Sequence, residues 1–160
     1  MPFPEHQRGP VRRLLSTLLP GASGNVFLDD FLPFQRKIAA GGMFNSLSQT
    51  LLKLAAPGVA DTYQGTEIWD LSLVDPDNRR PVDFARRRAV LEELRTAIAE
   101  VGSDLSPLAR RLVDSKEDGR IKLYLTMQGL RYRRQYPGLF LTGAYLPVDG
   151  GLTAAIGLHR

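Results

Sequence analysis

The sequence predicts an α/β protein that is mostly helical, and three features carry this prediction. Apolar residues recur every three to four positions over much of residues 25–138, which is the period of an amphipathic helix. Residues 59–64 form a short segment bounded by glycines and suit a buried strand. Residues 144–148 and 152–158, on either side of Asp149-Gly150-Gly151, are typical of a β-hairpin. The order of helix, strand, loop and helix is one βα step of an α/β architecture.

Two helices are predicted before this strand. The first begins at Asn25 and is interrupted by Gly41-Gly42, and the second covers residues 43–55 until Pro57-Gly58 stops it. Residues 1–24 are rich in proline, glycine and arginine, and we expect a ragged N-terminal segment there. The apolar positions of the two helices are Phe27, Phe31, Phe34, Ile38, Met43, Leu47, Leu51 and Leu54.

Three further helices are predicted from their start and stop signals. Asp83 is a good N-cap for a helix from residue 84 to about residue 100, and Gly102 ends it. Ser106-Pro107 opens a short helix, and Asp118-Gly119 precedes another that ends at Tyr136-Pro137-Gly138. One parallel strand cannot form a sheet, and a hairpin alone is marginal in water. We therefore expect the sequence to be incomplete at both ends.

Composition narrows the function classes. The chain has 160 residues, 43% of them apolar and 24% charged, which is typical of one globular domain. It has no cysteine, which excludes disulfide scaffolds and thiolate metal sites and fits a cytoplasmic location. Its two histidines, His6 and His159, lie near the termini, so a zinc site or a Ser-His-Asp triad is not expected. No stretch is long enough for a signal peptide or a membrane span.

The net charge of +4 could suggest a nucleic-acid partner. However, the 21 basic residues are interleaved with 17 carboxylates, and the arginine clusters are separated along predicted helices. Solvated helix faces and ion pairs within the chain explain this pattern better. We therefore expect no nucleic-acid partner and no membrane partner, and nucleic-acid binding is the weakest alternative.

The loop from residue 57 to residue 84 is the most informative part of the chain. It combines aromatic rings, carboxylates, amides and arginines. Sugars present hydroxyl groups that pair with polar side chains, and flat C–H faces that contact aromatic rings. The composition of this loop therefore predicts a site for a polyhydroxylated ligand.

Specific motifs in this loop resemble a known family. The pattern Pro57-Gly58-Val59, Tyr63, Gly65, Glu67 is similar to the eighth-strand signature of α-amylase-type (β/α)8 barrels. The run YQGTEIWDLSLVDPDNRRPVD at residues 63–83 resembles the maltooligosyl trehalose synthases more than any other branch of that superfamily. Residues 45–54 and 118–126 agree, so the resemblance covers roughly residues 27–145. The chain departs from the family pattern at residues 60–62, where a proline and an isoleucine are expected.

The resemblance implies a fold and an incomplete chain. Residues 25–138 would be the C-terminal portion of the barrel, with its last strand, its last helices and a helical extension. Residues 139–160 would be the first hairpin of a truncated C-terminal β-domain. A complete barrel takes about 250 residues, which this chain cannot contain.

The resemblance also implies an isomerase. Such enzymes convert the reducing-end α-1,4 linkage of a maltooligosaccharide to an α,α-1,1 linkage by retaining transglycosylation within one molecule. The family's catalytic carboxylates follow earlier strands, so no catalytic residue, no metal site and no cofactor is expected here. The expected partners are a maltooligosaccharide and the missing remainder of the enzyme, or a second copy through exposed apolar faces. The chain by itself is expected to be inactive.

The candidate substrate-binding residues lie at or after the end of the predicted strand, where barrel active sites are found. For two of them another interpretation stays open, because Tyr63 could pack in the barrel and Glu67 could pair with an arginine. Trp69 is interpreted as an anchor of the loop rather than as a sugar platform. The candidates are Tyr63, Gln64, Glu67, Asp75, Asn78, Arg79 and Arg80.

Three alternatives stay open or are set aside. A hydrolase of the same superfamily that releases trehalose would carry similar motifs, and a non-catalytic carbohydrate-binding remnant would need no more than this loop. A glycosidase pair made of Glu67 with Asp70 or Asp75 is not favoured, because nothing places two carboxylates about 5–5.5 Å apart across a sugar.

Overall fold

The computed structural model describes residues 25–148 and 155–159. The chain divides into two compact units, Met1–Asn45 and Ser46–Arg160. The predicted ragged segment, residues 1–24, and the predicted hairpin turn at residues 149–151 lie outside the described residues.

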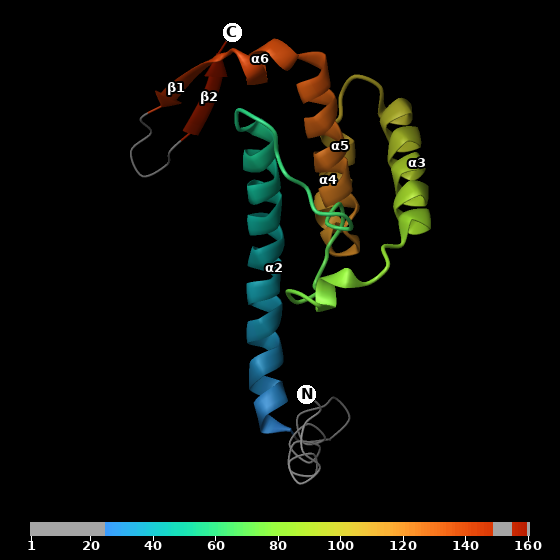
Figure 1. Ribbon diagram of the computed structural model, residues 1–160. Helices are drawn as coiled ribbons and strands as arrows, with labels where there is room; N and C mark the ends of the chain where they lie inside the picture. The colour runs from blue at the N-terminus through green and yellow to red at the C-terminus, as the bar shows by residue number, and fades with distance from the viewer. Residues whose placement is uncertain (1–24, 149–154, 160) are drawn as a thin grey trace. The chain divides into compact units, whose positions relative to one another are not determined.

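Helices make up most of the described chain (Figure 1). An antiparallel hairpin pairs β1 (Ala144–Val148) with β2 (Ala155–His159) and places Tyr145 opposite Leu158. That this hairpin belongs to a larger β-domain stays a prediction. The helices are α2 (Val26–Ala55), α3 (Phe84–Val101), α4 (Ser106–Asp114), α5 (Arg120–Gln135) and α6 (Pro137–Leu141), with single 3₁₀ turns η1 (Asp77–Arg79) and η2 (Lys116–Asp118).

α2 is one continuous helix, so the predicted break at Gly41-Gly42 was wrong. Each glycine in a helix interior costs about 1 kcal/mol relative to alanine, but it fits helical backbone angles without strain. Helix formers on both sides of the pair, Ala39-Ala40 and Met43, are enough to carry the helix through it.

The starts of α3, α4 and α5 lie where the sequence predicts them. The Asp83 carboxylate accepts a hydrogen bond from the backbone N–H of Arg86 at 2.8 Å, so its role as N-cap is confirmed. α4 begins at Ser106 with Pro107 in its first turn. α5 follows Gly119, whose φ of 83° is left-handed.

The core of the second unit lies between α3, α4 and α5, which pack side by side (Figure 1). Their apolar stripes meet because each helix buries one face, and Leu94 of α3 is 2% exposed. The loop before α3 closes this core with Ile68 and the partly buried Trp69. The buried helix residues of this cluster are Leu94, Leu108, Leu112, Ile121, Leu123 and Met127.

Residues 59–64 do not form the predicted strand, which is a correction. They run as an irregular segment, and Val59 is 96% exposed. A strand requires neighbouring strands to pair its N–H and C=O groups. Within the described residues the two paired strands belong to the hairpin alone, so this segment has no strand beside it.

Arg133 of α5 closes the C-terminal end of α2. Its guanidinium donates to the backbone carbonyls of Leu54 at 2.7 Å, of Ala56 at 2.8 Å, and of Gly58. It also stacks on the Phe140 ring, with its Cζ 4.3 Å from the ring centroid. Carbonyls at a helix C-terminus lack partners within the helix, so this arginine satisfies groups that would otherwise be unpaired.

Arg133→Met is therefore expected to lower the free energy of unfolding by about 2 kcal/mol, which is the typical contribution of hydrogen bonding by a charged group. Arg133→Lys should recover only part of this, because an ammonium group cannot span three carbonyls as a planar fork does. Urea denaturation followed by circular dichroism at the helix band measures the change. Arg134→Met is the matched control at an exposed neighbour, and an equal loss in both variants would contradict the assigned role.

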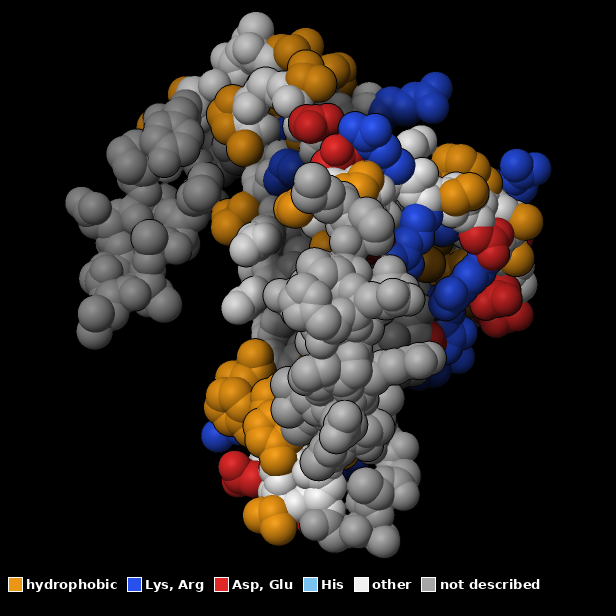
Figure 2. Space-filling model, turned by 60° about the horizontal axis from the view of Figure 1, so that its bottom comes forward, with side chains coloured by type: hydrophobic (Ala, Val, Ile, Leu, Met, Phe, Trp, Pro, Cys, Tyr) orange, Lys and Arg blue, Asp and Glu red, His pale blue; other side chains and the backbone are white. Residues whose placement is uncertain are grey.

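The described surface mixes charges and exposes apolar side chains at several places (Figure 2). Basic and acidic side chains lie next to one another, and several form ion pairs, such as Arg95 with Glu92 at 2.6 Å. No described helix is both long and apolar enough to cross a membrane. Self-association through the exposed apolar residues stays a prediction.

Candidate functional site

A pocket of about 450 Å³ lies between the loop after residue 63 and the first turn of α3. Three of the predicted site residues, Gln64, Asn78 and Arg80, line it together. The apolar part of its wall comes from Ile68, Trp69, Leu71, Pro81 and Val82. We call this space the loop pocket.

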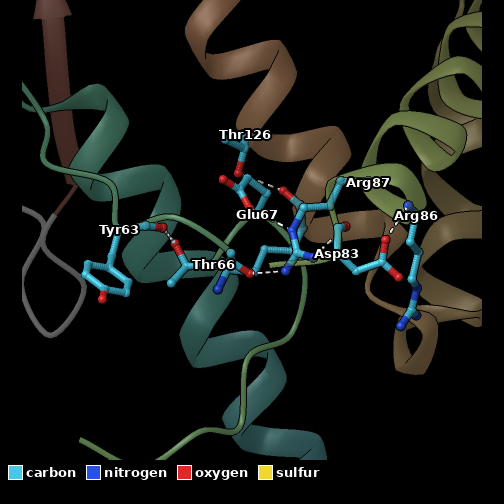
Figure 3. A network of polar contacts seen from close by, with 9 residues as sticks. Tyr63, Thr66, Glu67, Asp83, Arg86, Arg87 and Thr126 are labelled. Atoms are coloured by element: carbon cyan, nitrogen blue, oxygen red, sulfur yellow. Dashed lines mark hydrogen bonds and ion pairs between the residues drawn. The ribbon is translucent and has the colours of Figure 1, made fainter. Parts of the chain in front are cut away.

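Arg87 of α3 orders the loop beside this pocket (Figure 3). Its Nε donates to Glu67 Oε2 at 3.0 Å, its Nη2 to the carbonyl of Gly65 at 2.5 Å, and its Nη1 to the carbonyl of Asp83 at 3.0 Å. The side chains of Arg87 and Glu67 are 16% and 26% exposed, so solvent screens their ion pair less than a surface pair. The pair holds the loop against the start of α3.

The sequence left open that Glu67 pairs with an arginine, and the structure shows this pair with Arg87. Contact of Glu67 with substrate stays a prediction. Sequence reasoning missed Arg87, which lies in the cluster Arg86-Arg87-Arg88. The sequence indicates only part of its role: Arg87 lies four residues after the N-cap Asp83, and residues four apart lie on one face of a helix. Nothing in the sequence indicates its contact with Gly65.

Both arginines of the predicted pair are engaged inside the loop. Arg79 makes two hydrogen bonds to Asp75, at 2.5 Å and 2.8 Å, and both side chains are exposed. Arg80 pairs with Asp77, whose other carboxylate oxygen accepts from the backbone N–H of Leu73 at 2.7 Å. The loop therefore holds its own shape, and Asp75 and Arg79 lie outside the lining of the loop pocket.

The Asn78 amide oxygen is buried in this wall without a hydrogen-bond partner among the described residues. A buried carbonyl-type oxygen that accepts no hydrogen bond costs about 1–3 kcal/mol, so native proteins rarely leave one unsatisfied. Asn78 also lines the loop pocket, so a ligand placed there would lie against its side chain.

The carboxylates around the loop pocket are suited to accept hydrogen bonds rather than to donate protons. Hydrogen bonds from the Ser72 hydroxyl and from its backbone N–H lower the pKa of Asp70. The backbone N–H of Leu73, followed by Arg80, lowers the pKa of Asp77. A general acid at neutral pH requires a raised pKa, so neither aspartate fits that role. Among the residues that the structure describes, no group of three His, Cys, Asp or Glu side chains could hold a metal ion.

Trp69 anchors the loop in the core, as predicted. Its Nε1 donates to the carbonyl of Lys116 at 2.6 Å, and its ring packs against the buried cluster. Lys122 Nζ lies 5.7 Å from the centre of the ring. Tyr63, by contrast, does not line the loop pocket; it is 48% exposed and belongs to a second pocket on α2 and α5.

Comparison with known proteins places the chain beside one family. No family model matches it. A protein of Mycobacterium tuberculosis (strain H37Rv), described as "Putative maltooligosyl trehalose synthase", is 41% identical over 111 residues, which are 69% of this chain and 11% of that protein. The counterpart in strain CDC 1551 / Oshkosh matches to the same extent.

Solved structures agree with the sequence match. The crystal structure of a maltooligosyl trehalose synthase superimposes with a TM-score of 0.72 at 36% identity, over 85% of this chain and 18% of that one. The maltooligosyltrehalose synthase of Arthrobacter ramosus superimposes with a TM-score of 0.63 at 37% identity, over 87% of this chain and 16% of that one. The chain thus spans about 11% of the length of the curated relatives it matches. The resemblance indicated by the motifs is confirmed, and its helical fold matches part of the fold of these longer proteins.

Proposed function

We propose that this chain, which matches a segment of the maltooligosyl trehalose synthases, forms one wall of a carbohydrate-binding pocket and supplies no group that breaks a glycosidic bond. The observation that carries the proposal is the loop pocket, whose lining brings the side chains of Gln64, Asn78 and Arg80 together beside an apolar wall. Amide and guanidinium groups pair with adjacent sugar hydroxyls, and the apolar wall around Trp69 suits the C–H face of a sugar ring.

The reaction proposed for the whole protein is an isomerisation of maltooligosaccharides to maltooligosyl trehalose. It needs a nucleophilic carboxylate, a carboxylic acid and the retention of the released glucose, which then attacks the glycosyl intermediate through its anomeric hydroxyl in place of water. The loop pocket would contribute to the last requirement by holding the reducing-end glucose. The lowered pKa values of Asp70 and Asp77 support the assignment of the proton-donating acid to another part of the protein.

The remainder of the enzyme is the proposed partner of the irregular segment 59–64. With neighbouring strands present, its backbone N–H and C=O groups would pair as the last strand of a barrel. Within that complex we propose substrate contacts for Tyr63, Gln64, Glu67, Asp75, Asn78, Arg79 and Arg80, and a cytoplasmic location.

Asn78→Leu is expected to weaken binding of maltopentaose to the chain about three- to tenfold, the value of one hydrogen bond of about 1 kcal/mol. Isothermal titration calorimetry measures this. Asn45→Leu is the control, because it removes an exposed amide outside the loop pocket and should leave the affinity unchanged. No binding by the unmodified chain, or equal affinities in the Asn78 variant and the unmodified chain, would contradict the assigned pocket.

The purified chain is also expected to leave the reducing ends of maltopentaose intact, because the bond-breaking carboxylates are assigned elsewhere. A reducing-sugar assay with chromatography of the products measures this. Loss of reducing power without release of glucose would show that the chain isomerises alone. Release of free trehalose or glucose would instead favour a hydrolase.

A further inference from the structure

A second pocket, of about 350 Å³, lies between the C-terminal part of α2, residues 61–66 and α5. It shares no lining residue with the loop pocket. Two lysines face it from different helices, Lys53 of α2 and Lys122 of α5. We call it the lysine pocket.

Neither lysine has an ion-pair partner within 4.0 Å among the described residues, although several other basic residues do. Burial, and after it the positive charge of Lys53, lowers the pKa of Lys122, while Asp70 and Glu67 act in the opposite direction. Two like charges that face one space with no carboxylate within ion-pair distance are unfavourable, and an anion between them would lower that cost. The pocket therefore has the electrostatics of an anion site.

The hydroxyl groups of this pocket set a second requirement for its ligand. Thr50, Thr66 and Thr126 each donate their hydroxyl proton to a backbone carbonyl, at 2.8, 2.7 and 2.9 Å. Each oxygen is thus left to accept hydrogen bonds. The carboxylate of Asp61 in the same wall also accepts and cannot bind an anion. A ligand that suits the whole pocket carries both an anionic group and hydroxyl donors.

We propose that the lysine pocket binds a phosphorylated sugar. The phosphate lies between Lys53 and Lys122, where ammonium groups donate charge-assisted hydrogen bonds. The sugar hydroxyls donate to the threonine oxygens and to Asp61, and the exposed ring of Tyr63 lies beside them. The lysine pocket shares no lining residue with the loop pocket, although Tyr63 is also one of the proposed maltooligosaccharide contacts.

Calorimetry of the full chain with glucose 6-phosphate, inorganic phosphate and glucose tests the proposal at low salt and neutral pH. Glucose 6-phosphate is expected to bind more tightly than either of the others. Lys122→Gln is expected to weaken its binding about tenfold, the size of a lost charge-assisted hydrogen bond. Lys53→Gln should act in the same direction, and it changes an exposed residue of α2, where folding is least at risk.

Lys37→Gln is the matched control, since it removes the same charge from an exposed position of α2 outside the pocket. It should leave the affinity unchanged, and Lys53→Gln should leave maltopentaose binding unchanged, because Lys53 does not line the loop pocket. Three results would overturn the proposal: no binding of glucose 6-phosphate, equal losses in the Lys37 and Lys122 variants, or affinity for glucose or inorganic phosphate as high as for glucose 6-phosphate.

Discussion

Leu94→Ala is expected to lower the free energy of unfolding by about 3 kcal/mol, because it removes a buried leucine from the centre of the helical core. Leu94 is 2% exposed and packs in the cluster that α3, α4 and α5 share. Truncation loses the transfer free energy of the side chain and leaves a cavity that a rigid three-helix packing fills only in part. Urea denaturation measured by Trp69 fluorescence reports this directly, since the chain has one tryptophan and it packs on this cluster.

The control for Leu94→Ala is the same substitution at Leu71, which is 93% exposed. A surface truncation of this kind is expected to change the free energy of unfolding by less than about 0.5 kcal/mol. Similar losses in the two variants would show that α3 does not pack on the core as described. A change in the slope against urea, rather than in the midpoint, would indicate a loss of two-state unfolding.

Gly119→Ala is expected to destabilise the second unit by about 2–3 kcal/mol, for two separate reasons. The backbone of Gly119 has φ of 83°, where a side chain costs about 1–2 kcal/mol. A Cβ placed there would also lie 3.2 Å from the backbone nitrogen of Trp69 and 3.2 Å from Ile68 Cβ. The backbone of the loop would have to shift to accept it, which would move Trp69 away from the core.

Thermal denaturation by circular dichroism measures the stability of the Gly119 variant, and a shift of the Trp69 emission to longer wavelength reports the movement of the loop. Gly58→Ala is the matched control, because Gly58 has φ of 87° but no atom within 4 Å of the position that an alanine Cβ would take. It should show the backbone cost alone, about 1–2 kcal/mol, without the emission shift. Equal losses of stability and equal emission shifts in the two variants would show that the contact with Trp69 and Ile68 does not cause the effect of Gly119→Ala.

The ends of the helices could be predicted because their signals are local. Asp83 caps α3, Ser106-Pro107 opens α4 and Gly119 precedes α5, and each signal acts within one turn of the chain. The apolar period of α3 likewise predicted a buried face, and Leu94 lies at its centre.

Two predictions failed because they treated a local preference as decisive. Gly41-Gly42 weakens a helix but does not break one whose flanking residues favour it. Residues 59–64 have the composition of a strand, but a strand exists only where another strand pairs with it.

For the candidate site, the residue types predicted a site for a polyhydroxylated ligand, which stays a prediction, whereas the arrangement of these residues depends on how distant segments pack. The composition of the loop predicted a polar pocket with an aromatic anchor, and Trp69, Gln64, Asn78 and Arg80 form such a pocket. Only the packing of α3 against the loop brought Arg87 onto Glu67. Only the approach of α5 to α2 brought two lysines 69 positions apart in the sequence to one pocket and placed Tyr63 there. The residue types limit which interactions can form. Which distant segments come into contact depends on how the whole chain buries its apolar surface, and no local sequence pattern specifies that.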